Sequence, residues 1–198
     1  MANKKYIVTI TRQFGSLGRP IAREMSEILG IEYYDRDIVD AAAKKMKLPV
    51  STISDADETV SNGFFQMMFP LGQSGIRMQH DVFDTQREII LNIADKGNCI
   101  IVGRCADIIL RNNYIPHISL FISAPFEVRL KYMMNVREMD QKTAVKFLKK
   151  MDRQHKKYYE FYTSEKWGTP ENYDLCINSA NYGIKETIEI IERLIINR

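Results

Sequence analysis

Apolar residues along the chain alternate between two kinds of pattern. Five short apolar runs, rich in β-branched residues, are separated by segments whose apolar residues recur at the three- and four-residue spacing of one helix face. Continuous apolar runs are typical of strands that are covered on both sides. The pattern therefore predicts an α/β fold, with a five-stranded parallel sheet and helices on both faces. The predicted strands are residues 6–11, 31–34, 98–102, 118–123 and 175–178.

Helices are expected in the intervening segments, and Gly30 should cap the first of them. Asp35 to Asp37 should cap and begin the second. Between residues 54 and 80 the pattern weakens, and we favour internal packing over an oligomer contact or a substrate flap for a Phe/Met-rich patch there. The patch comprises Phe64, Phe65, Met67, Met68 and Phe69. The predicted helices are residues 19–29, 37–47, 82–94, 105–112, 126–135, 137–167 and 182–196.

The turn between the first strand and the first helix has features that suit a phosphate group. Residues 13–18 form a glycine-containing turn, and Arg19-Pro20 opens the helix. Free backbone N–H groups and the positive end of a helix dipole both favour an anion. In the phosphate-loop pattern G-x-x-x-x-G-K-[ST], only Gly18 matches outright. An ordinary strand-to-helix turn explains the glycines equally well, but Arg19, which can bind phosphate bidentately, favours phosphate.

Polar groups follow three predicted strands at their carboxyl ends. Residues 15–19 follow the first strand, Asp35 and Arg36 follow the second, and Arg104 follows the third. These ends meet at one edge of a parallel sheet, where ligands of such folds bind. Three strand ends that each offer phosphate-binding groups are a stronger indication than the glycine turn alone.

The segment 137–167 is rich in lysine and has one apolar helical face. It has three interpretations: a solvated helix, a lid that closes over polyphosphate through Arg153, or a nucleic-acid surface. The third is disfavoured because only one helix is basic and its aromatic residues lie on the packing face. His155 lies on the apolar face, so we interpret it as a packing residue rather than a catalytic base. No Ser/His/Asp arrangement, glycosidase-type carboxylate pair or metal cluster indicates hydrolysis.

Composition adds limits to these assignments. The chain has 198 residues, 45% of them hydrophobic and 27% charged, which is typical of one globular domain. A net charge of +3 gives no global electrostatic argument for nucleic acid, and no apolar run reaches membrane-spanning length. The three cysteines lack metal-ligand spacing. We expect them to be free and reduced, in a cytoplasmic protein.

Six segments, in order, resemble the nucleoside monophosphate kinases and specifically the cytidylate kinase-like family. They are ITRQFGSLGRPIA, EYYDRDIVDAAAKK, IIVGRCADIIL, SLFISAPFEVRLKYM, MDRQHKKYYEFYTSEKWG and YDLCINSANYGIKETIEII. The resemblance implies a single P-loop kinase domain with a core (1–53, 82–136 and 168–198), an acceptor-binding insertion (about 35–94) and a lid (about 137–167). It also implies transfer of the ATP γ-phosphoryl group, with Mg²⁺, to a nucleoside monophosphate, with CMP or dCMP favoured.

The resemblance further implies roles for individual residues. Arg19 and Arg153 would be catalytic, and the phosphates would be held by Gly15, Ser16, Leu17, Gly18 and Arg19. The acceptor would be bound by Asp35, Arg36, Arg104 and Lys157. Cys105 stands where the family has an aspartate that helps to recognise cytosine. The metal ligand is unassigned, because Pro20 replaces the hydroxyl residue that normally ligates Mg²⁺; Ser16, another group or water would have to take its place.

Two alternatives remain beside a nucleoside monophosphate kinase. One is a kinase of another small metabolite, which the change at Cys105 permits, and the other is a regulatory protein that binds nucleotide without turnover. A Rossmann oxidoreductase is disfavoured because G-S-L-G is not G-x-G-x-x-G. The expected partners are small nucleotides, without nucleic acid or membrane, and the expected assembly is a monomer or a homodimer.

Overall fold

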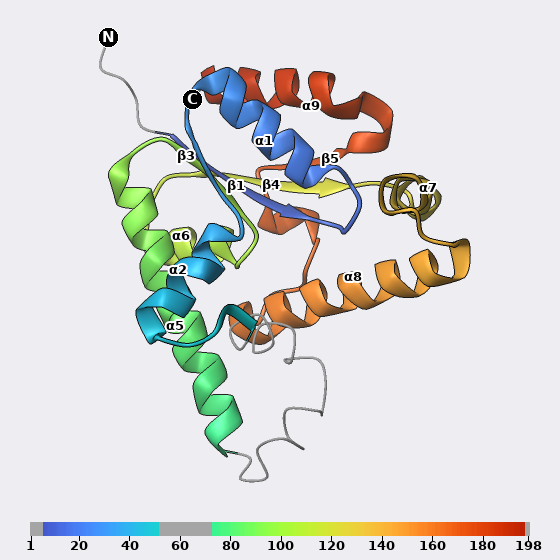
Figure 1. The fold of residues 1–198 in the computed structure, drawn as a ribbon. Helices are drawn as coiled ribbons and strands as arrows, with labels where there is room; N and C mark the ends of the chain where they lie inside the picture. Colours follow the sequence, from blue (N-terminus) through green and yellow to red (C-terminus); the bar gives the residue numbers. More distant parts are fainter. Residues whose placement is uncertain (1–5, 52–72, 197–198) are drawn as a thin grey trace.

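The computed structural model describes residues 6–51 and 73–196. Its five strands form one parallel sheet (Figure 1), and their order is β2-β3-β1-β4-β5. This arrangement confirms the predicted parallel α/β sheet. The predicted Phe/Met-rich patch, residues 64–69, lies outside the described residues. The strands are β1 (Ile7–Arg12), β2 (Glu32–Tyr34), β3 (Cys99–Val102), β4 (Ile118–Ser123) and β5 (Leu175–Asn178).

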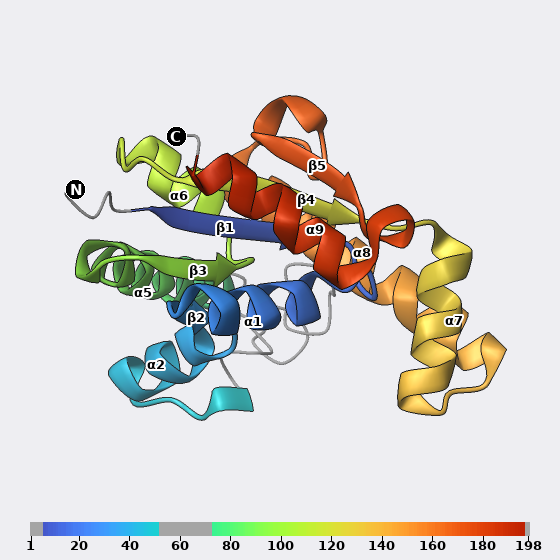
Figure 2. The ribbon, with the colours of Figure 1, turned by 90° about the horizontal axis from the view of Figure 1, so that it is seen from above.

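Helices cover both faces of the sheet (Figures 1 and 2). On one face, α1 (Gly18–Leu29) and α9 (Ser179–Ile196) enclose an apolar core with the central strands. On the other face, α2 (Asp37–Met46), α5 (Gln73–Lys96) and α6 (Ala106–Asn112) enclose a second core. The central strand β1 is therefore buried from both sides, as its continuous apolar sequence predicts.

Two further helices stand at the carboxyl ends of the strands. The helix α7 (Phe126–Arg137) follows β4, and α8 (Gln141–Thr163) passes back beneath the sheet edge (Figure 1). The predicted helices 126–135 and 137–167 correspond to α7 and α8, but the boundary differs, because α7 extends to Arg137 and the chain turns at Glu138, which has a left-handed φ of 51°. Asp140 then caps α8 by accepting a hydrogen bond from the Thr143 backbone N–H at 3.1 Å.

Other helix ends also differ from the prediction. α5 begins at Gln73 rather than residue 82, and α9 begins at Ser179 with an interruption at Gly183. Gly30 caps α1 in the left-handed conformation, as predicted. Asp35 does not cap α2: the N-cap is Arg36, without a side-chain cap bond, and Asp35 forms ion pairs instead.

Candidate phosphate-binding site

The turn from β1 into α1 has an open, strained backbone. Gly15 and Leu17 both adopt left-handed conformations, with φ of 77° and 63°. Within the described part of the chain, the backbone N–H groups of Gly15, Leu17 and Gly18 donate to no protein oxygen. Free donors at a helix N-terminus favour an anion, so the loop geometry agrees with the predicted phosphate loop.

Side chains fix this loop to the ends of neighbouring strands. Gln13 Oε1 accepts a hydrogen bond from the Ala124 backbone N–H at 3.1 Å, just beyond β4. The Ser179 hydroxyl donates to the Ser16 carbonyl at 2.7 Å, just beyond β5. The Ser16 side chain is itself buried and lies 2.9 Å from the Gln13 carbonyl. These contacts hold the loop in one shape, so its N–H groups are organised before a ligand arrives.

A buried ion pair links the loop to both α7 and α8. Nη1 of Arg129 donates to Asp152 Oδ2 at 2.7 Å and to the Phe14 carbonyl at 3.0 Å. Oδ1 of Asp152 accepts a bond from the Phe14 backbone N–H, also at 3.0 Å. Both polar groups of the Phe14 backbone are thereby satisfied, and α8 is held against the loop.

Arg12, the last residue of β1, runs along the carboxyl edge of the sheet. Its side chain is only 14% exposed, and Nη2 lies 3.6 Å from Asp35 Oδ1 at the end of β2. The side chain passes between Gly18 and Gly103, because a Cβ atom at either glycine would collide with it. Burial is the main cause that lowers the pKa of Arg12 to about 10. Arg12 therefore stays charged at neutral pH in a rigid position.

Arg19, at the lysine position of the phosphate loop, also reaches Asp35. Its Nε pairs with Oδ2 of Asp35, while its side chain stays 45% exposed. The Tyr33 hydroxyl donates to the same oxygen at 3.3 Å, and burial is the main cause that raises the pKa of Tyr33 to about 12. Asp35 is thus surrounded by donors from three elements of the chain.

Arg104 joins the site from a strained segment after β3. Gly103, Arg104 and Cys105 all have left-handed φ values, of 75°, 57° and 54°. For residues other than glycine this conformation costs about 1–2 kcal/mol each and is concentrated at functional sites. The Arg104 guanidinium lies 5.8 Å from the centre of the Tyr158 ring, within cation–π range. We refer to Arg12, Arg19 and Arg104 as the arginine cluster.

The imidazole of His155, on α8, lies close to the arginine cluster. Burial above all, followed by the three neighbouring guanidinium groups, lowers its pKa to about 3. His155 is therefore neutral, and its buried Nδ1 has no hydrogen-bond partner among the described residues. Its ring also lies near Phe14 and Trp167, with centroids 6.1 and 6.2 Å away. The packing role predicted for His155 is confirmed, but the structure adds a position at the site.

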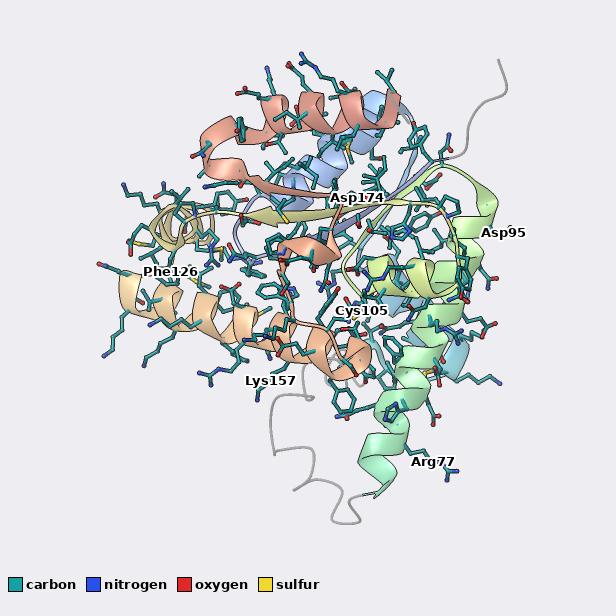
Figure 3. The ribbon with its side chains drawn as sticks, turned by 180° about the vertical axis from the view of Figure 1, so that it is seen from behind. Arg77, Asp95, Cys105, Phe126, Lys157 and Asp174 are labelled. Atoms are coloured by element: carbon teal, nitrogen blue, oxygen red, sulfur yellow. The ribbon has the colours of Figure 1, made fainter. Side chains whose placement is uncertain are left out.

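Other predicted site residues lie apart from the cluster. Arg153 and Lys157 are exposed, and each is two residues from His155, which on a helix corresponds to about 200° of rotation. They therefore lie on the outer face of α8, and Lys157 points away from the sheet in Figure 3. Arg36 is exposed at the start of α2, and no ion pair joins it to the cluster among the described residues. Their predicted roles remain predictions.

Sequence reasoning missed three residues of the site: Arg12, Arg129 and Asp152. A signal for Arg12 was present, since a charged residue directly after a buried strand and before a glycine turn is unusual. Arg129 and Asp152 lie on separate helices, 23 positions apart, and carried no such signal.

The described donors near the loop do not offer a ligand set for a metal ion. Both oxygens of Asp35 face guanidinium groups, and both oxygens of Asp152 accept hydrogen bonds. The Ser16 hydroxyl is buried against main-chain carbonyls, and Pro20 has no hydroxyl. Within residues 6–51 and 73–196, no group of three or more His, Cys, Asp or Glu residues could hold a metal. A polyphosphate fits the site, but a protein-held Mg²⁺ does not.

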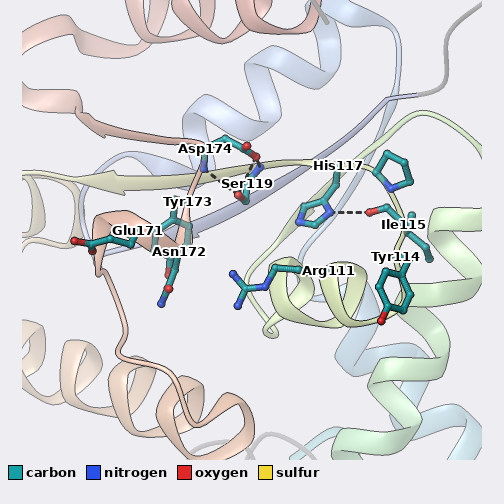
Figure 4. A pocket seen from close by; sticks show the side chains of 10 residues that line it. Arg111, Tyr114, Ile115, His117, Ser119, Glu171, Asn172, Tyr173 and Asp174 are labelled. Atoms are coloured by element: carbon teal, nitrogen blue, oxygen red, sulfur yellow. Dashed lines mark hydrogen bonds between the residues drawn. The ribbon is translucent and has the colours of Figure 1, made fainter.

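A separate pocket of about 450 Å³ lies at the opposite edge of the sheet, near the start of β4 (Figure 4). Polar groups in its wall interact with one another: Asp174 Oδ2 accepts bonds from the backbone and hydroxyl of Ser119, at 2.8 and 3.0 Å. Nδ1 of His117 lies 2.9 Å from the Ile115 carbonyl. The lining has a single arginine, Arg111, which pairs with Glu165, so the pocket does not gather positive charge as the arginine cluster does.

Comparison with known families agrees with this site. The model of the cytidylate kinase-like family matches residues 7–181, which include every residue of the arginine cluster. This chain belongs to the cytidylate kinase-like family. A cytidylate kinase of Methanococcus aeolicus is 31% identical over 110 residues, 54% of this chain. The match spans only 61% of that relative, so its activity cannot be transferred as a whole.

Several solved structures have a similar fold. A protein of Eubacterium ventriosum, described as uncharacterized, has 28% identity and a TM-score of 0.74 over 98% of this chain and 100% of its own. A shikimate kinase of Bacteroides thetaiotaomicron has 8% identity and a TM-score of 0.58 over 97% and 99% of the two chains. The latter likeness shows the P-loop kinase fold alone.

Two further observations concern membrane-spanning helices and cysteines. None of the helices in the described part of the chain combines the length and apolar character needed to cross a membrane. Within the described part of the chain, no disulfide joins Cys99, Cys105 and Cys176.

Proposed function

We propose that this kinase transfers the γ-phosphoryl group of ATP to a nucleoside monophosphate, with CMP or dCMP as the favoured acceptor. The observation that carries the proposal is the arginine cluster. Two of its guanidinium groups pair with one carboxylate, and all three lie near a neutral imidazole, beside a loop with free N–H donors. The excess of positive charge suits a phosphate donor and an anionic acceptor that meet at the same point.

The protein groups would act by positioning and by charge. The loop N–H groups would hold the donor phosphates, and Arg19 would turn from Asp35 toward the migrating group. Arg104 would hold the acceptor phosphate. The new bond forms between an acceptor oxygen and the γ-phosphorus, while the bond from that phosphorus to the oxygen shared with the β-phosphate breaks.

Two segments would have the family's mobile roles. We propose residues 35–94 as the acceptor-binding insertion and residues 137–167 as the lid, which would exclude water from the reaction. The Arg129–Asp152 pair supports this assignment because it joins the lid helix α8 to the phosphate loop. Arg153 and Lys157 would reach the substrates only through a rotation or closure of α8. A cytoplasmic location is proposed from the family alone.

A second candidate is a kinase of another small metabolite. The observation in its favour is that Cys105 is 3% exposed and belongs to the core beneath the sheet. A side chain buried there does not recognise an acceptor base, so the position that would help to select cytosine is lost from the pocket. The same site would then bind an acceptor in which another chemical group replaces the cytosine nucleoside.

The test is ADP production from ATP against a panel of nucleoside monophosphates, with an acceptor-free control. Fast turnover with CMP, dCMP or UMP supports the first proposal. Nucleotide binding without turnover on this panel would move the assignment to another metabolite or to a regulatory binder. Arg19→Ala should reduce turnover by about 10² or more, since it removes a phosphate-binding cation. Arg23→Ala, on the exposed face of α1, is the matched control and should be silent.

A further inference from the structure

We propose that this chain neutralises the phosphates with fixed guanidinium groups, and that a metal ion enters only as part of the nucleotide complex, without a direct ligand from residues 6–51 or 73–196. The inference rests on the proposed function and deepens it. It concerns the chemistry of the same site, where the phosphate-loop pattern would place a Ser or Thr hydroxyl on Mg²⁺ and this chain has Pro20.

The first argument is the state of Asp35, the carboxylate closest to the loop arginines. Its Oδ1 faces Arg12 at 3.6 Å and its Oδ2 pairs with Arg19. Mg²⁺ binds carboxylate oxygens at about 2.0–2.1 Å with octahedral geometry. Even when Arg19 turns toward the migrating group, an ion at that distance from Asp35 would stand beside Arg12, which is buried and unable to withdraw. Coulomb repulsion in this partly buried place disfavours the ion.

The second argument concerns the remaining oxygen donors around the loop. Asp152 uses Oδ1 for the Phe14 N–H and Oδ2 for Arg129, so its displacement would detach α8 from the loop. The hydroxyls of Ser16 and Ser179 are both 1% exposed and lie on main-chain carbonyls. Among the described residues, these contacts leave the nucleotide phosphates and water as the available metal ligands.

The third argument is the rigidity of Arg12. Gly18 and Gly103 leave just enough space for its side chain, and Asp35 fixes its guanidinium. A rigid, permanently charged group at the floor of a site can stabilise phosphate charge without reorganisation, which is what a bound metal ion supplies elsewhere. Arg12, Arg19 and Arg104 together with the Asp35 carboxylate carry a net charge of +2.

The experiment compares the affinity of a non-hydrolysable ATP analogue in excess Mg²⁺ and in EDTA, by calorimetry. The metal-free analogue carries more negative charge, which favours binding to guanidinium groups. Removal of Mg²⁺ should therefore weaken binding by less than about tenfold. A protein ligand to the metal would favour the magnesium complex, and a preference above about tenfold would overturn the proposal. Absence of binding in both conditions would instead overturn the proposed function, and the inference with it.

Variants and a second readout sharpen the result. Arg12→Lys keeps the positive charge but loses the planar, bidentate guanidinium group. It should therefore weaken the binding of the analogue by a similar factor with and without Mg²⁺. Asp35→Asn should leave the ratio of the two constants unchanged, and a ratio that changes only in this variant would identify Asp35 as a metal ligand. The paramagnetic resonance of Mn²⁺ added to the protein without nucleotide should match that of the free ion. Retained Mn²⁺ would contradict the inference.

Discussion

Replacement of Gly18 by alanine should separate the position of Arg12 from the stability of the fold. Gly18 begins α1 with an ordinary φ, so alanine is compatible with its backbone. The new Cβ would lie 2.8 Å from Arg12 Cβ and 2.9 Å from its Cγ. Ordinary carbon contacts begin near 3.4 Å, so Arg12 must move by about 0.6 Å close to its own backbone. Such a shift cannot be absorbed at the flexible end of the side chain.

The expected cost has two parts. Overpacking in a buried site destabilises by about 1–3 kcal/mol. The shifted Arg12 would lose its contact with Asp35, already long at 3.6 Å, and misplace its guanidinium. Misplacements of this size cost about 10- to 100-fold in rate, or about 1.4–2.7 kcal/mol of transition-state stabilisation. The assay is kcat/KM from ADP release with the acceptor found on the panel, beside thermal unfolding.

Gly30→Ala is the matched control. Gly30 has a left-handed φ of 63° and no atom within 4 Å of its Cβ position. Alanine there should cost about 1–2 kcal/mol of stability through backbone strain, with turnover unchanged. Wild-type kcat/KM for a folded Gly18→Ala protein would refute the role of Arg12, and an equal loss in both variants would show that stability alone controls the activity.

Three further predictions concern stability and pH. Arg129→Ala leaves Asp152 charged and partly buried without its partner, so the free energy of unfolding, measured in denaturant, should fall by about 3–5 kcal/mol. A decrease below about 1 kcal/mol would contradict a stabilising role for the Arg129–Asp152 ion pair. His155 has a folded pKa of about 3, below its unfolded value, so the unfolded chain binds more protons between these values and stability falls on acidification. Between pH 6.5 and pH 5 this group should remove about 1.5 kcal/mol, and His155→Phe should flatten that slope in pH-dependent melts. Burial raises the pKa of Asp107 above its unfolded value, so its contribution is largest below the unfolded pKa and is lost as pH rises through the folded pKa. Asp107→Asn should therefore weaken this loss of stability with rising pH while keeping a hydrogen bond with Tyr159, whose hydroxyl lies 2.8 Å from the carboxylate; an unchanged pH profile would argue against the buried charge.

The local sequence determined most of the fold. Two of the predicted strands, residues 118–123 and 175–178, match β4 and β5 to the residue. Strands buried on both faces carry continuous apolar runs, and helices carry spaced ones, so both can be recognised within a short window. The break between α7 and α8 was expected near residue 136, but its exact place was not, because Glu138 carries no local signal for a left-handed turn.

The site was only partly visible in the sequence. The glycine loop, Asp35 and Arg104 could be placed at one sheet edge, because parallel strands end on the same side. The path of a side chain, by contrast, depends on what surrounds it in three dimensions. Only the tertiary structure showed that Arg12 passes between two glycines from distant parts of the chain, and that both loop arginines share one carboxylate. Period and propensity act over a few residues, whereas burial and ion pairing depend on contacts between residues far apart in the chain.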